Sequence, residues 1–296
     1  MRRRLLALLL LPPLLADCGG SPLPDAATPV DETLRRETRA GRLAYELERP
    51  DEAVSRYRAA LTRAQERDDL GAIGDLGYNL AVAELRANLP DRALADARAT
   101  RAELERRGAK PSPALLLAEA TALYRNGAAA EADAAAARVA AESDVDAAAR
   151  ATFLRGLIAD ERGDGGSLAA AAAALGSTGP PSLQADAAEL NARLALRQGD
   201  SERARREATR AASLRQETLD YRGLARALAL EGEAARRAGD TAAAADFFLR
   251  AGRSAVAQDD KETARRWLKQ AILLAPDGVV AGAASDLLHQ IDRGEP

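Results

Sequence analysis

Residues 232–251 read GEAARRAGDTAAAADFFLRA. Strong helix formers fill both halves of this stretch. Gly239-Asp240 separates the halves, and Gly suits the end of a helix while Asp suits the start of the next. Gly232 stands twelve residues before Ala244, and Phe248 follows Ala244 by one helical turn. The stretch therefore predicts two helices that fold back on each other, with Gly232 allowing a close approach.

The same arrangement recurs along the chain at intervals of 36 to 40 residues. The positions equivalent to Ala244 are held by Ala53, Ala93, Ala132, Leu168 and Ala204. Twelve residues before these positions stand small residues, namely Gly41, Ala81, Ala120, Gly156 and Ala192. Self-similarity at such a period is typical of a solenoid of stacked helical hairpins. A solenoid offers an extended binding surface, so the pattern favours a binding function over a catalytic one.

The repeated unit resembles the tetratricopeptide repeat, whose hairpin carries Gly or Ala, a Gly-Asp or Gly-Asn turn, Ala, an aromatic residue, Ala and a closing Pro. The clearest copies lie at residues 41–60, 232–251 and 252–276. The middle repeats lack the aromatic residue, the early Trp of the family is absent, and the period exceeds the family's 34 residues or so. The resemblance implies an all-α fold, a right-handed α-solenoid of about 13–14 helices, with the first helix of each pair lining a concave face.

We expect six hairpins over residues 31–276. The expected helices span 31–48 and 51–68, 70–87 and 91–107, 113–125 and 128–141, 146–162 and 167–175, 182–198 and 201–215, and 217–238 and 241–258. Because the copy at 252–276 overlaps the one before it, helix 241–258 is expected to serve two neighbouring pairs. A helix at 279–291, within a capping segment and tail at 277–296, would cover the exposed end of the array.

The first 18 residues predict export and lipidation. Three arginines precede an apolar run at 5–15, which is shorter than the 20 or so residues that span a bilayer. Residues 15–18, LADC, resemble the lipobox of bacterial lipoproteins, although Asp17 departs from the small residue usual there. The resemblance implies a signal peptide at 1–17, a lipid on Cys18 and a tether at 18–30. A plain secretory signal or a chance cysteine is the alternative.

Composition narrows the function further. Removing residues 1–17 takes away three Arg and one Asp, which changes the formal net charge from −3 to −5 and argues against a nucleic-acid partner. The single cysteine excludes an internal disulfide and a thiolate metal cluster. We find no motif for catalysis and expect no catalytic residue, metal or cofactor. His289 is expected on the surface, residues 163–167 in a turn, and Asp68-Asp69 and Asp259-Asp260 at helix ends.

Candidate partner-binding residues are the arginines and aromatic residues near the small residue of each first helix, because both types are favoured in binding hot spots. They are Arg42, Tyr45, Tyr78, Arg86, Tyr124, Arg125, Phe153, Arg193, Arg197, Arg236 and Arg237. These side chains could instead pack between repeats, and the sequence leaves both interpretations open.

The function expected from these features is a scaffold of the bacterial cell envelope, lipid-anchored on the periplasmic face of the outer membrane. It would hold an envelope protein or peptide in its concave groove, as similar proteins do in outer-membrane assembly, pilus biogenesis or control of cell-wall enzymes. An envelope enzyme that acts on glycan with paired carboxylates is the alternative, and a cytosolic adaptor is a third hypothesis.

Overall fold

The computed structural model describes residues 30–294. The predicted signal peptide, Cys18 and all but the last residue of the predicted tether lie outside the described residues. The chain divides into a segment Met1–Glu32 and a compact unit Thr33–Pro296.

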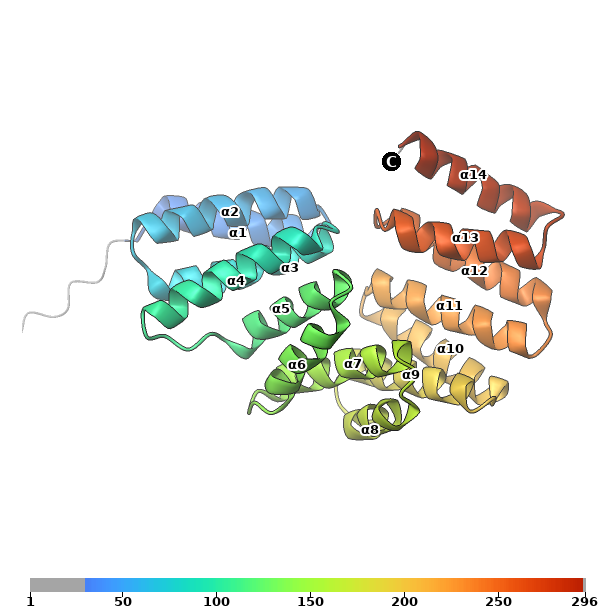
Figure 1. Cartoon of the computed structure of the whole chain (residues 1–296). Helices are drawn as coiled ribbons and strands as arrows, with labels where there is room; N and C mark the ends of the chain where they lie inside the picture. Colours follow the sequence, from blue (N-terminus) through green and yellow to red (C-terminus); the bar gives the residue numbers. More distant parts are fainter. Residues whose placement is uncertain (1–29, 295–296) are drawn as a thin grey trace, which may run out of the picture. The chain divides into compact units, whose positions relative to one another are not determined.

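Residues 30–294 form helices and turns and no strand (Figure 1). The helices are α1 (Glu32–Glu46), α2 (Pro50–Glu66), α3 (Leu70–Arg86), α4 (Pro90–Arg106), α5 (Pro113–Arg125), α6 (Ala129–Ala140), α7 (Val145–Glu161), α8 (Gly165–Leu175), α9 (Pro181–Arg197), α10 (Ser201–Glu217), α11 (Tyr221–Arg237), α12 (Thr241–Val256), α13 (Lys261–Leu274) and α14 (Val279–Arg293). From α2 to α14, consecutive helices pack on each other, and α1 packs on α2 where Gly41 meets Tyr57. The predicted all-α solenoid of helical hairpins is confirmed.

One short turn explains the spacing of the helices. Between α11 and α12, Gly239 adopts a φ of 85°, which suits glycine because it has no Cβ to clash. The backbone N–H of Asp240 donates to the carbonyl of Ala235 at 3.0 Å, and the Asp240 carboxylate accepts from the N–H of Ala243 at 3.0 Å. Asp69 and Asp260 cap α3 and α13, as predicted for helix ends. The predicted turn at 163–167 is too long, because Asp164 caps α8 and the helix begins at Gly165. With helices of 17 residues, such as α3 and α4, the Gly239-Asp240 type of turn gives the long period.

The predicted helix at 217–238 is wrong in its first turn. Helix α10 continues to Glu217, and α11 begins at Tyr221 after a turn of the same kind. The left-handed position of this turn is held by Leu219, with a φ of 55°, and Asp220 is the N-cap. Because a leucine stands where the turns before α10 and α12 have Gly199 and Gly239, no residue marked the break in the sequence.

Leu219→Gly is expected to stabilise the protein by about 0.5–1 kcal/mol. The left-handed conformation costs an L-residue such as leucine roughly 1–2 kcal/mol, and glycine avoids this cost. Glycine loses more chain entropy on folding than leucine does, and this loss offsets only part of the gain. The Leu219 side chain is 61% exposed, so its removal loses little burial. Urea unfolding measures the change. The control is Leu273→Gly within α13, which should destabilise by about 1 kcal/mol; destabilisation by both variants would contradict the argument.

The glycines of the repeats lie where paired helices touch. A Cβ on Gly41 would lie 2.8 Å from the Tyr57 ring, and a Cβ on Gly232 would lie 3.2 Å from the Phe248 ring. A Cβ on Gly252 of α12 would lie 2.6 Å from Leu268 of α13. Helix α12 therefore packs on α11 through one face and on α13 through another, as predicted from the overlapping copies.

The core is a row of small clusters, each shared between neighbouring hairpins, instead of a single large one. Every repeat anchor is fully buried: Ala53, Ala93, Ala132, Leu168, Ala204 and Ala244. At the end of the array, α14 packs on α12 and α13 and buries Ile291 in their cluster, while His289 is exposed.

Candidate partner-binding face

Three of the candidate arginines hold neighbouring repeats together. Each ends a first helix and donates to a carbonyl at the end of the preceding first helix. Arg125 Nη1 donates to Leu85 O at 2.5 Å, Arg237 Nη1 donates to Leu196 O at 2.5 Å, and Arg197 donates to Asp160 O. Cations at a helix C-terminus satisfy its unpaired carbonyls and favour the helix dipole. We call these contacts the arginine caps.

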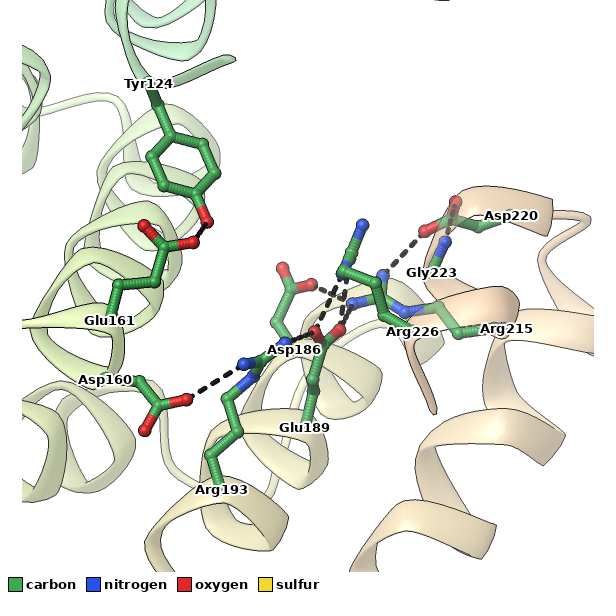
Figure 2. A network of polar contacts seen from close by, with 10 residues as sticks. All are labelled: Tyr124, Asp160, Glu161, Asp186, Glu189, Arg193, Arg215, Asp220, Gly223 and Arg226. Carbon is green, nitrogen blue, oxygen red and sulfur yellow. Dashed lines mark hydrogen bonds and ion pairs between the residues drawn. The ribbon is translucent and has the colours of Figure 1, made fainter. Parts of the chain in front are cut away.

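A buried ion-pair network joins α7, α9, α10 and α11 (Figure 2). The Glu189 carboxylate on α9 is fully buried and accepts from three guanidinium groups, those of Arg226 at 2.8 Å, Arg193 at 3.1 Å and Arg215 at 3.2 Å. Burial alone raises the pKa of Glu189, but the charges of Arg226, Arg193 and Arg215 outweigh it and lower the pKa well below its usual value. Glu189 is therefore an anion at neutral pH.

The network contains equal numbers of positive and negative side chains. Arg215 also contacts Asp186 at 2.5 Å and Asp220 at 2.9 Å. Its cations are Arg193, Arg197, Arg215 and Arg226, and its anions are Asp160, Asp186, Glu189 and Asp220. Opposite charges are thus matched inside the protein, and this part of the face retains little charge for a partner.

Two candidate aromatic residues belong to the same neighbourhood. Phe153 of α7 has the guanidinium of Arg215 at 5.6 Å and that of Arg226 at 5.7 Å from its ring centroid, within the range of cation–π attraction. The Tyr124 hydroxyl hydrogen-bonds to Glu161, as Figure 2 shows, and burial raises its pKa. Both aromatic residues thus pack between repeats.

The end of α3 contacts a distant part of the chain. Arg222 of α11 donates to the carbonyl of Arg86 at 3.1 Å, and the Asn88 side chain donates to the carbonyl of Asp259 at 3.2 Å. The Arg125 guanidinium donates a hydrogen bond to the Asn88 side-chain oxygen in the same turn. Burial, helped by the charge of Arg222, lowers the pKa of Arg125 to about 10. These contacts cover the end of the α3 helix.

The remaining candidates are less enclosed. Arg86 pairs with Glu48 at 2.9 Å and lies 5.4 Å from the ring centroid of Tyr45. Tyr78 is half-buried, and burial raises its pKa. Arg236 and Arg237 both pair with Glu233 at 2.7 Å and are partly exposed. Whether any of these residues binds a partner stays a prediction.

An open groove of about 430 Å³ lies between α1 and α3 on the first-helix face. It is lined by Leu34, Arg35, Thr38, Arg39 and Arg42 of α1 and by Ala72, Asp75, Leu76 and Asn79 of α3. We call it the α1–α3 groove. Of the predicted candidates, Arg42 lines it, whereas Arg35 and Arg39 were missed. The recurrence of arginine at positions 35, 39 and 42, which share one helical stripe, was the signal that could have found them.

A second groove, of about 400 Å³, lies between α6, α7 and α8. Its charged side chains largely satisfy one another, since Arg155 and Arg162 contact Asp133 at 2.9 and 3.5 Å. The Asp164 carboxylate accepts from the Ser167 hydroxyl at 2.6 Å. This groove offers a ligand fewer unmatched charges than the α1–α3 groove does.

One pair of carboxyl groups bears on the enzyme alternative. Glu84 of α3 and Asp96 of α4 share the guanidinium of Arg58, at 2.5 and 2.8 Å. Burial, then the neighbouring Asp96, raises the pKa of Glu84 to about 8. Neither acid lines the α1–α3 groove or the groove at α6–α8, and Glu84 is fully buried between helices. The pair is therefore not presented to a substrate in either groove.

Because the pKa of Glu84 is raised in the folded state, we expect the stability of the folded protein to fall as pH rises. Because the folded pKa of about 8 exceeds the unfolded value of 4.5, the contribution is fully present below about pH 4.5 and is lost as pH rises through 8. We expect thermal unfolding to show a loss of stability over this window of at most about 5 kcal/mol, at about 1.4 kcal/mol for each pH unit between the two pKa values. Glu84→Gln should flatten the profile, and Glu46→Gln, on the surface, should not. A wild-type profile that rises across this window would contradict the assignment.

In the described part of the chain, no cluster of three His, Cys, Asp or Glu residues is arranged to hold a metal ion. None of the helices described is both long and apolar enough to cross a membrane.

Three features together identify the type of hairpin: the repeating turns, the glycine contacts with Tyr57 and Phe248, and the shared helix α12. The array is tetratricopeptide-like.

Comparisons with known proteins yield no matching family model and no matching curated protein. Among solved structures, a tetratricopeptide repeat protein from Parabacteroides merdae is 16% identical with a TM-score of 0.49, covering 88% of this chain and 98% of that one. A chain of the APC/C hetero-tetramer Cut9–Hcn1 is 13% identical with a TM-score of 0.48, and the match covers 87% of this chain and 54% of that one. The TPR2AB domain of yeast Sti1, in complex with pHSP90, is 16% identical with a TM-score of 0.36, and the match covers 88% of this chain and 98% of that one.

Proposed function

We propose that this protein is a scaffold of the bacterial cell envelope that holds a protein partner in the α1–α3 groove. The observation that carries the proposal is that this groove is open and lined by exposed cations. Most arginines farther along the first-helix face are instead matched by internal carboxylates or carbonyls. Solenoids commonly use such a surface for binding.

The proposed location is the periplasmic face of the outer membrane, with a lipid on Cys18 as the anchor. The support is the charged and apolar start of the chain followed by LADC at 15–18. A lipid-held scaffold would keep its partner near the membrane, which suits outer-membrane assembly, pilus biogenesis or control of cell-wall enzymes. We propose a non-catalytic role, since the array brings no evident catalytic set into its groove.

Site-specific crosslinking in cells tests the binding role. A photoreactive residue replacing Arg39, in the groove, should yield a defined adduct with an envelope protein, and the same residue replacing exposed Lys269 on α13 should not. Equal adducts at both positions, or none at Arg39, would refute the groove as the partner site.

Radiolabelled palmitate tests the anchor. Incorporation into the wild-type chain and loss of label in Cys18→Ala are expected. Absence of label in the wild type would overturn the lipoprotein assignment and leave the scaffold role to the crosslinking result.

A further inference from the structure

The two walls of the α1–α3 groove differ in charge. On α1, Arg35, Arg39 and Arg42 follow one another at intervals of four and three residues, so their side chains share one stripe about 10 Å long. On α3, the facing stripe is formed by Ala72, Asp75, Leu76 and Asn79. Half-buried Leu34 and Ala72 supply an apolar surface beside the charges, and Leu76 is buried in the core beneath them.

The groove carries an excess of positive charge, and at Arg39 and Arg42 this charge is open to exchange. Three arginines face one acid, Asp75, among its lining residues. Within the described residues Arg39 makes no hydrogen bond or ion pair, and the Arg42 side chain is 77% exposed in its contact with Glu46 at 2.8 Å. Exposed ion pairs of this kind are weak, so a ligand carboxylate could compete for Arg42 at little cost. Arg215 in the buried network, by contrast, is only 5% exposed.

We infer that the α1–α3 groove binds an amphipathic helix of a partner protein, with acidic residues at positions i, i+4 and i+7. Such a helix has the same turn spacing as α1, so its carboxylates can meet successive arginines. Apolar residues on its adjoining face would cover Leu34 and Ala72, as in other helix-in-groove complexes. The inference rests on the proposed function and specifies the chemistry of the partner.

Designed peptides test the register of the charges. One 18-residue helical peptide carries Glu at i, i+4 and i+7 beside a leucine face, and an isomer of identical composition has its Glu residues spread around the helix. Both are acetylated and amidated, so no terminal carboxylate takes part. Fluorescence anisotropy should show about tenfold tighter binding of the first peptide to the full chain. Equal affinities would overturn the inference.

A matched pair of variants tests the site. Arg39→Glu/Arg42→Glu should weaken binding of the first peptide at least about tenfold. Arg253→Glu/Lys269→Glu, which makes the same charge change on exposed positions of α12 and α13, should keep the affinity within about twofold. Circular dichroism checks that both variants stay helical. Wild-type affinity in the Arg39/Arg42 variant would reject the groove as the site.

Two outcomes separate this inference from the proposed function. If crosslinking at Arg39 captures an envelope partner whose bound segment lacks acidic residues, the scaffold role stands and the acidic helix is wrong. If a single-stranded DNA of matched charge binds more tightly than the acidic peptide, the groove recognises phosphate and the inference falls. Peptide binding in register without any cellular adduct would leave the groove chemistry intact and remove the proposed role.

Discussion

Glu189→Gln is expected to destabilise the protein by about 3–5 kcal/mol, the usual cost of removing one partner from a buried ion pair. The substitution keeps the shape of the side chain and removes the one charge that Arg193, Arg215 and Arg226 share. Those guanidinium groups would then be buried with too little negative charge around them. Urea unfolding followed by circular dichroism measures the loss.

Glu46→Gln is the matched control for Glu189→Gln. Glu46 is also paired with an arginine, Arg42, but on the surface, so its loss should cost at most about 1 kcal/mol. If both variants lost the same stability, the network at Glu189 would be no stronger than a surface pair.

Acid should reproduce part of the Glu189 effect. The pKa of Glu189 is lowered in the folded state, so its contribution is fully present above the unfolded value of 4.5 and is lost as pH falls below it. The Glu189→Gln variant should therefore lose less stability than the wild type on acidification.

Gly77→Ala is expected to destabilise the protein by about 1–3 kcal/mol, although alanine is the better helix former. A Cβ on Gly77 of α3 would lie 2.7 Å from the Cβ of Thr100 on α4 and closer still to the rest of that side chain. Thr100 is buried, so it has little room to move away. Thermal and urea unfolding measure the change.

Gly74→Ala, one turn earlier on the same helix, should have the opposite sign. Its Cβ would meet Leu104 at an ordinary contact distance of 3.5 Å, so the gain in helix propensity of up to about 1 kcal/mol remains. The double variant Gly77→Ala/Thr100→Ala should recover much of the loss. If Gly77→Ala and Gly74→Ala changed the stability by the same amount, the close approach of α3 and α4 at Gly77 would not require glycine.

The repeat pattern predicted most of the fold because its signals are local. Gly239-Asp240 marks a turn by itself, and Gly232 marks a close approach that alanine-rich surroundings do not hide. The break at Leu219 was missed because its left-handed backbone is imposed by the turn and not preferred by the residue.

The candidate site was harder to predict. The sequence placed Arg193 and Arg125 on the right helices, but their partners Asp160 and Leu85 lie a repeat away, and pairing across repeats depends on how the helices stack. Glu189 had no local signal beyond an acid among apolar neighbours. The stripe at Arg35, Arg39 and Arg42 was visible in the sequence, and only the open groove beside it distinguished it from an ordinary solvated face.

The arginine caps have a consequence for how the array comes apart. A repeat protein unfolds as one body only as far as each unit is coupled to the next. The caps couple α3 to α5 through Arg125, and α7 through α9 to α11 through Arg197 and Arg237. Within the described residues, Arg162, just past the end of α7, contacts Asp133 of α6 instead of the end of α5. Tyr124 of α5 still hydrogen-bonds to Glu161 of α7, so this joint is linked by side chains without an arginine cap. Hydrogen exchange should therefore find that the helix ends at this joint open more easily than those at the capped joints.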